Sequence, residues 1–452
     1  MTGHRTRFGR RGLLAATAAV TATALLTPAA VADTAAPTAD GRRASVVRSL
    51  ERAAHPLRST EPGGRTTDLR ALDAMIGDAG VVGLGEATHG SHEFFAMKER
   101  VLRHLVETKG FTTFALEMSW SAGLTIDEYL QGGEGDARRI AEEALAGSPW
   151  EREEFVSLIA WMRDHNRRHP ERKVHFMGDD IGAPRLGDRI FERVTATVRT
   201  AEPASLPRLD ELYAGLRPMD DVFAYLRKPL AERRENAVRA QEALDLVTTA
   251  VGGGAAGEDG EWAVQHARNI AQTFAFTGLD VSDPASVSAA EHLRDRAMAD
   301  NVLWWHRRTG DRMLLSAHNG HVGYLSTDPR MYPVTQGAYL RDALGGGYLT
   351  IGFTFNRGSF LTKDTSLGGD WRKTTVPPAA PGMHEHTLDR VRHRDFYLDL
   401  RTAPARARDW LNTARPVYDA GSVFHPDPPA LALGLAYDVL IHLHRVREAR
   451  PL

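Results

Sequence analysis

A strand, a turn, a helix and a second strand follow one another closely near the start of the chain, and this unit constrains the fold most. Residues 81–85 are a short apolar run bounded by glycine, the pattern of a buried strand. A turn at 87–90 leads to Ser91 as a helix N-cap, and apolar residues then recur at helical spacing as far as Lys109. Residues 111–118 are again strand-like. Such a unit is a βαβ crossover, so we expect its two strands to be parallel neighbours.

Further segments extend the same pattern. Residues 173–177, 313–317 and 348–355 are short apolar runs that predict three more strands. The stretch 188–305 is rich in Ala, Leu, Arg and Glu, and it predicts amphipathic helices interrupted by a glycine-rich loop at 251–260. The fold class that follows is α/β, with a mostly parallel sheet flanked by helices and a helical insertion.

The ends of the chain carry their own signals. The first 32 residues combine an arginine-rich start, an apolar run and the A-x-A sequence Ala30–Ala32, which together predict a cleaved signal peptide. The pair Arg10 and Arg11 favours the twin-arginine type over an ordinary secretory signal. We therefore expect a secreted protein without a membrane anchor, with a flexible lead-in at 33–44. At the other end, residues 430–447 predict a closing helix.

Composition and missing motifs exclude several kinds of chemistry. The 452 residues include no cysteine, so disulfides, a thiolate nucleophile and Cys-bound metal are excluded. The formal net charge of −2 gives no indication of a nucleic-acid partner. The sequence contains no G-x-S-x-G elbow, no P-loop and no strand-linked G-x-G-x-x-G. A serine hydrolase or a nucleotide-dependent enzyme is therefore not indicated.

Polar residues with proton chemistry collect where the predicted strands end. Because parallel strands expose their carboxyl ends at one edge of the sheet, these side chains are expected to meet there: Glu86, His89, Glu117, Asp179, His318 and His321. A neutral imidazole can take a proton from water while a carboxylate fixes its tautomer, and His89 with Glu86 or Glu117 supplies that pair. His318 and His321 could polarise a carbonyl or protonate a leaving alkoxide.

Other interpretations of these residues stay open. Two histidines and two carboxylates could also bind zinc with an open fourth position, although no H-E-x-x-H helix accompanies them. The pair at 179–180 is interpreted as a helix N-cap or a loop pair. The histidine-rich piece at 384–386 is expected in a surface loop, and Trp304 and Trp305 are expected in a helix core or packed at the cleft wall.

The stretch GLGEATHGSHEFFAMKERVLRHLVETKGFTTFALE resembles the opening of the erythromycin-esterase superfamily. The resemblance continues in order through WMRDHNR, RDRAMADN, AHNGHVG and IGFTFNRGSF, and it covers nearly all of a domain at 45–452. It implies metal-independent, cofactor-free hydrolysis of a cyclic ester, with the helical insertion forming one wall of the active-site cleft. Carried over by position, His89 would be the general base, with its partners in these roles: Glu86 and Glu117 orienting it or the water, Arg100 and Arg294 binding substrate, and His318 and His321 completing the polar site.

The expected function is therefore hydrolysis of a small-molecule carboxylic ester or lactone of macrolide type. Export is unexpected for a cytoplasmic antibiotic-inactivating enzyme, so the substrate could instead be an extracellular lactone or a secreted metabolite. Two alternatives use the same residues. One is an acyltransferase or cyclase, in which an alcohol replaces water. The other is an extracellular binding protein for a metal or porphyrin-like ligand.

Overall fold

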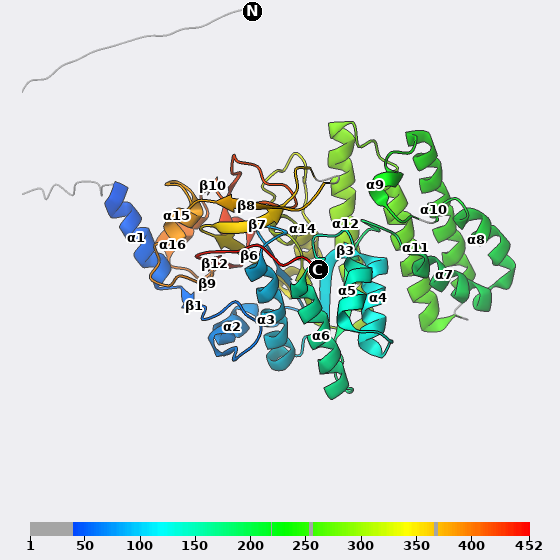
Figure 1. The fold of residues 1–452 in the computed structure, drawn as a ribbon, viewed down its shortest axis with the longest axis horizontal. Coiled ribbons are helices and arrows are strands. Elements are labelled where there is room, and N and C mark those ends of the chain that lie inside the picture. The colour runs from blue at the N-terminus through cyan, green and yellow to red at the C-terminus, as the bar shows by residue number, and fades with distance from the viewer. Residues whose placement is uncertain (1–38, 218, 253–255, 366–368) are drawn as a thin grey trace, which may run out of the picture.

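The computed structural model describes residues 39–452, apart from 218, 253–255 and 366–368 (Figure 1). The predicted signal peptide at 1–32 and the lead-in as far as residue 38 lie outside the described residues. The rest of the predicted flexible lead-in is helical, because helix α1 (Ala39–Glu51) already begins at its first described residue. Alanine and arginine are good helix formers, and both recur in this stretch.

An eight-stranded, mostly parallel sheet forms the centre of the molecule. Its strand order is β1-β9-β12-β6-β2-β5-β3-β4. The six strands from β12 to β4 are parallel to their neighbours, and the β1–β9 and β9–β12 pairs are antiparallel. The bounds of the eight strands are β1 His55–Pro56, β2 Val81–Leu84, β3 Thr113–Ser119, β4 His175–Asp180, β5 Met313–Ser316, β6 Tyr348–Phe355, β9 Phe396–Asp399 and β12 Val439–Leu443.

The predicted βαβ unit is present, but its two strands are not neighbours. Strand β2, helix α3 (His92–Lys109) and strand β3 follow as expected, and Gly110 ends the helix in a left-handed conformation with φ 66°. Strand β5 pairs in parallel with both β2 and β3 and therefore lies between them. A crossover helix can span one intervening strand, and local sequence does not show which later segment fills that place.

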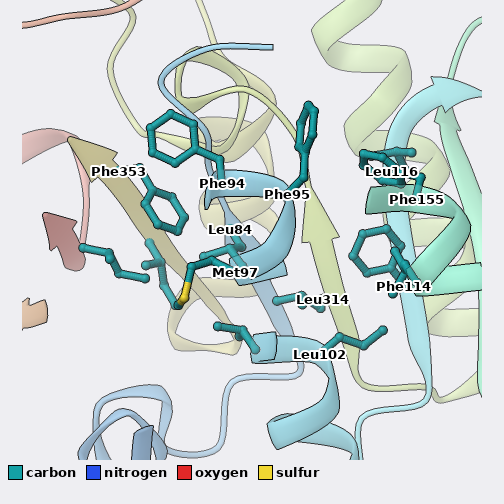
Figure 2. Close-up of a cluster of buried hydrophobic side chains, with 14 of the residues drawn as sticks. Leu84, Phe94, Phe95, Met97, Leu102, Phe114, Leu116, Phe155, Leu314 and Phe353 are labelled. Atoms are coloured by element: carbon teal, nitrogen blue, oxygen red, sulfur yellow. The ribbon is translucent and has the colours of Figure 1, made fainter. Parts of the chain in front are cut away.

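Helices cover both faces of the sheet, as the alternation of buried side chains requires. On one face, Val82 and Leu84 of β2 and Leu314 of β5 share a core with the helices α2 (Arg70–Ile76), α3 and α6 (Glu153–Arg168). Figure 2 shows Phe94, Phe95 and Met97 of α3 beside strand residues of this core, including Leu84 and Phe353. On the other face, Val81, Met313 and Leu315 pack with the later helices.

Those later helices come from the stretch predicted as a helical insertion. Helices α7, α8, α10 and α11 gather at one end of the molecule, away from α1 (Figure 1). Helix α12 returns the chain to β5 and contacts β4. The break between α10 and α11 falls within the predicted glycine-rich loop. The bounds are α7 Asp188–Ala201, α8 Leu206–Tyr213, α9 Val222–Tyr225, α10 Leu230–Val251, α11 Gly257–Thr277 and α12 Pro284–Thr309.

The predicted closing helix at 430–447 is wrong. This stretch forms the short strand β11 (Ala430–Leu431), one turn of helix α17 (Leu433–Ala436) and strand β12. Strand β12 is buried along its whole length between β6 and β9. A short apolar run can be helix or strand, and here its position inside the sheet decides.

The remaining elements fill the edges of the sheet and its loops. Their bounds are α4 Trp120–Gln131, α5 Ala137–Leu145, α13 Asn319–Val322, α14 Gln336–Leu344, α15 His384–Leu388, α16 Ala405–Leu411, β7 Gly358–Thr362, β8 Arg372–Val376 and β10 Arg415–Pro416. Trp305 is buried near the end of α12 and donates to Thr113 Oγ1, so it lies in a helix core as expected, whereas Trp304 is half-buried and packs against the same core. None of the described helices is long and apolar enough to span a membrane.

Candidate active site

The turn after β2 holds the first histidine–carboxylate pair. His89 Nδ1 lies 2.5 Å from Glu86 Oε1, and the other oxygen of Glu86 pairs with Lys98 of α3. Burial raises the pKa of Glu86, but Lys98 and His89 outweigh burial and lower that pKa below its usual value. The charged carboxylate therefore accepts the Nδ1–H of His89, and this hydrogen bond leaves the lone pair on Nε2.

Glycine makes this turn possible through close backbone approach. A Cβ atom at Gly90 would lie 2.2 Å from Leu361 O, and Leu361 N donates to Gly90 O at 3.0 Å. A Cβ at Gly85 would lie 2.1 Å from Asn319 Oδ1. Asn319 in turn bonds the backbone of Phe353, so the turn after β2 is locked to the segments after β5 and within β6.

Glu117 at the end of β3 joins several of the other predicted residues. Its carboxylate accepts from His318 N at 2.8 Å and from Arg294 Nη2 at 2.9 Å, and it lies 3.3 Å from His321 Nε2. Burial raises the pKa of Glu117, but the charges of His321, His89 and Arg294 hold it well below the usual range. Glu117 is therefore a buried anion in contact with three residues, one from α12 and two from the segment that begins α13.

Helix α12 carries Arg294, a cation that contacts Glu117, and Asp295, a second buried carboxylate. Arg294 makes a fork to both carboxylate oxygens of Asp180, and its side chain is 18% exposed. The neighbouring Asp295 lies 2.7 Å from His321 Nδ1. Burial lowers the pKa of His321, yet Glu117 and Asp295 outweigh it and raise that pKa well above the usual value. His321 is thus held between two carboxylates by both ring nitrogens.

His318 lies beside His89, with their ring centroids 5.1 Å apart. Its Nδ1 accepts from Gly320 N at 3.1 Å, which places the proton of the neutral ring on Nε2. His318 Nε2 lies 3.1 Å from Asp419 Oδ1, and both atoms are buried. Thr327 Oγ1 donates to the other oxygen of Asp419 at 2.8 Å. Asp419 therefore gives His318 a carboxylate partner from a distant loop.

The loop that carries Asp419 also covers His89. Ala420 N donates to Ala87 O at 2.8 Å, and a Cβ at Gly421 would lie 3.6 Å from His89 Nε2. His318 Nε2 and His321 Nε2 each lie within 3.3 Å of a carboxylate oxygen, whereas His89 Nε2 has neither a hydrogen bond nor an ion-pair contact with the described residues. That atom is the one best placed to receive a proton.

The motif at 384–386 is not a surface loop, so this expectation is wrong. It begins α15, where His384 and Glu385 are fully buried. Glu385 Oε1 accepts from Tyr418 N at 2.8 Å, and His384 Nε2 lies 2.9 Å from Leu431 O. Burial raises the pKa of Glu385 to about 8, so the buried carboxyl is largely neutral at pH 7. Helix α15 therefore fastens the segment that carries Asp419 at two points.

The pair at 179–180 is neither a helix cap nor a loop. Both residues are buried in the last positions of β4, where Asp180 pairs with Arg294. Asp179 accepts from Gln336 Nε2 at 2.6 Å. Burial, together with the charge of Asp180, raises the pKa of Asp179 well above its usual value. Both residues are buried because of this position at the end of the strand. Only the carboxylate of Asp180 pairs with a cation among the described residues.

The structure brings together all the predicted site residues except Arg100. Arg100 is buried on α3, where it pairs with Asp68 at 2.6 Å and donates to Arg65 O. It shares no hydrogen bond or ion pair with the described residues around Glu117. We therefore leave Arg100 out of the proposed mechanism. Across the described ranges, no group of three or more His, Asp or Glu side chains is arranged to hold a metal ion.

Three residues of this site were not found from the sequence, namely Lys98, Asp295 and Asp419. Lys98 did have a signal, because it occupies a position in the apolar stripe of α3 and is fully buried. Asp295 stands next to Arg294 in the RDRAMADN motif. Asp419 had no comparable signal, because its loop has neither helical nor strand periodicity.

Asparagine at position 419 tests the second histidine–carboxylate pair. Burial lowers the pKa of His318, but Asp419 and Glu117 raise it above its usual value of 6.5. Such a raised pKa stabilises the folded state below pH 6.5, and this stabilisation is lost as pH rises through the raised value. We expect Asp419→Asn to lower the free energy of unfolding by about 1–3 kcal/mol near pH 6, and by less near pH 9, in urea denaturation.

Thr327→Val is the matched control for Asp419→Asn, because it removes a hydrogen bond to Asp419 but keeps the carboxylate. Its effect on stability should be similar at both pH values. An Asp419→Asn effect that does not change with pH would contradict an ion pair between Asp419 and His318.

A mostly parallel sheet with a histidine–carboxylate network at its carboxyl edge defines an α/β protein with a buried polar site, and the relatives of the chain support a hydrolase. The chain belongs to the erythromycin esterase family, whose sequence model matches residues 106–446. It is 26% identical over 326 residues to erythromycin esterase type II of Escherichia coli, covering 66% of this chain and 74% of the relative. The predicted membership of the erythromycin-esterase superfamily and the predicted α/β fold are thus confirmed.

The chain resembles several solved structures, among them the following two. One is a succinoglycan biosynthesis protein, with a TM-score of 0.80 and 28% identity, covering 91% of this chain and 99% of the other. The other is a mutant of erythromycin esterase EreC in its open conformation, with a TM-score of 0.67 and 16% identity, covering 86% and 96%. The second likeness shows a shared fold.

Proposed function

We propose that this protein hydrolyses a carboxylic ester or lactone, with His89 as the general base. The observation that carries the proposal is the state of the His89 ring. Its Nδ1 is bound to a buried, charged Glu86, while Nε2 has no partner among the described residues. An imidazole held in this way takes a proton from water and leaves the carboxylate to stabilise the imidazolium.

The remaining network assigns the other roles. Arg294 is fixed by Asp180 and Glu117, yet its side chain keeps 18% exposure, so it is the partly accessible cation of the site. In our proposal it stabilises the oxyanion that forms when water attacks the carbonyl. Both ring nitrogens of His318 and of His321 lie beside a hydrogen-bond donor or a carboxylate, so in our proposal these two residues hold the positions of His89, Glu117 and Arg294.

A hydrolysis screen tests this function. The purified protein would be incubated with 4-nitrophenyl esters and a panel of macrolactones, with and without EDTA, and products would be identified by mass spectrometry. We expect release of the free acid, or of the ring-opened lactone, at the same rate with EDTA. Turnover that disappears with EDTA, or no turnover of any ester, would contradict the proposal.

The same residues suit a second candidate, acyl transfer, and the likeness to a protein of succinoglycan biosynthesis favours a reaction that forms a bond over one that only cleaves it. An alcohol would then replace water as the group that His89 deprotonates, and the same cation would stabilise the oxyanion. Adding a saccharide acceptor to the screen separates the two reactions, because transfer yields an acylated saccharide in place of the free acid.

A further inference from the structure

A buried arginine without a counter-ion lies close to His89. Arg152 precedes α6 and is only 2% exposed. Its Nη1 donates to Glu151 O, but Nε and Nη2 are buried without an acceptor. No ion pair of Arg152 occurs within the described ranges, and burial lowers its pKa to about 10 although the charges of Glu151 and Glu154 act in the opposite direction. A buried charge without a partner is costly, so its persistence suggests an anion that binds there.

The unpaired groups of this segment are all donors. Trp150 Nε1 is likewise buried without an acceptor, and Trp150 precedes Arg152 by two positions in the sequence. A water molecule could accept from these groups, but a carboxylate offers two acceptor oxygens and the opposite charge. The unsatisfied atoms therefore match an anionic ligand.

A second cation stands at the same aromatic ring. The Arg152 guanidinium lies 4.8 Å from the ring centroid of Trp371, and Lys363 Nζ lies 4.9 Å from that centroid. Lys363, like Arg152, makes no ion pair with any described residue, while Lys373 on the same hairpin pairs with Glu448. Burial, and then the charge of Arg152, lowers the pKa of Lys363 and outweighs the opposite effect of Asp370 and Glu151. Two like charges held this close together would be stabilised by an anion.

This cluster adjoins the proposed general base from two sides. The Trp150 ring meets the His89 ring edge-on, with centroids 5.6 Å apart. Lys363 N donates to Ser422 O at 2.7 Å, and the preceding Gly421 packs on His89. A substrate whose ester carbonyl reaches His89 can therefore extend a short acyl chain towards Arg152 and Lys363.

We propose that Trp150, Arg152 and Lys363 form an anion-binding subsite beside His89, which receives a carboxylate carried by the ester substrate. This inference rests on the proposed esterase function and deepens it. The substrate class is then the monoester of a dicarboxylic acid, in which one carboxyl is esterified and the other is free.

Two esters of matched length test the subsite. The anionic probe is mono-4-nitrophenyl glutarate and the neutral probe is 4-nitrophenyl pentanoate. We expect the wild type to favour the anionic probe in kcat/KM, and Arg152→Gln or Lys363→Gln to lower the ratio of anionic to neutral kcat/KM by about 10- to 100-fold. Lys373→Gln removes the same charge from the same hairpin and should keep the wild-type ratio. An unchanged ratio in Lys363→Gln would overturn the subsite.

Direct binding separates failure of the subsite from failure of the function. Glutarate itself would be titrated into the wild type and Lys363→Gln by calorimetry, which needs no turnover and avoids any folding defect of Arg152→Gln. Binding to the wild type that weakens in Lys363→Gln supports the subsite even if neither ester is cleaved. No binding of glutarate to the wild type would overturn it, whether or not esters are hydrolysed.

Discussion

Alanine at position 89 is expected to lower kcat for the ester substrate by about 10²–10⁴-fold, the usual contribution of one placed general base. The His89 ring is fixed by a 2.5 Å contact to Glu86, so the variant loses both the proton acceptor and its orientation. Residual turnover should remain, because Arg294 would still stabilise the oxyanion. Steady-state kinetics on an ester found in the screen, at saturating substrate, measure the effect.

His92→Ala is the matched control for this prediction. His92 is also buried, three residues further along, and both its ring nitrogens lie near carboxylates, Glu154 at 2.6 Å and Glu61 at 3.0 Å. It makes no contact with the proposed site, so its loss should change thermal stability rather than kcat. Full activity in His89→Ala would rule out His89 as the base, and equal losses of kcat in both variants would indicate a general effect on folding.

Much of this site could be predicted from the sequence because strand ends are local signals. Glu86, Glu117 and His318 each follow or end a short apolar run, and parallel strands place such ends at one edge. The contacts of Glu117 with His318 and Arg294 agree with that convergence. Local patterns thus identified the residues at strand ends, and the family resemblance added Arg294 on the long helix α12.

The residues that the sequence did not reveal depend on contacts between distant segments. Strand β5 takes its place between β2 and β3 only once the whole sheet forms. Asp419 reaches His318 from a loop that is held in place by Glu385. The sequence predicted Glu385 in a surface loop, but its side chain is fully buried. Arg100 is the opposite case, a residue that was predicted for the site but lies outside it. The family resemblance implied that it binds substrate, whereas its guanidinium pairs with Asp68.

Glutamine at position 117 is expected to lower the free energy of unfolding by about 3–5 kcal/mol, the usual cost of breaking a buried ion pair from one side. Glu117 faces donors from His318, Arg294 and His321, and an amide can accept from only some of them while its NH₂ faces the others. Urea denaturation at pH 7 measures the loss. We expect kcat to fall as well, because Arg294 loses one of the two carboxylates that aim it.

Arg294→Met and the double variant with Glu117→Gln complete the cycle and show whether the pair itself carries the loss. Removing both charges leaves neither partner buried alone, so the double variant should be less destabilised than the sum of the single ones, by about 1–3 kcal/mol. Asp180 then keeps an uncompensated charge, and this charge limits how much stability the double variant regains. Strictly additive losses would show that Glu117 acts on stability through His318 or His321, and its role in orienting Arg294 would have to be abandoned.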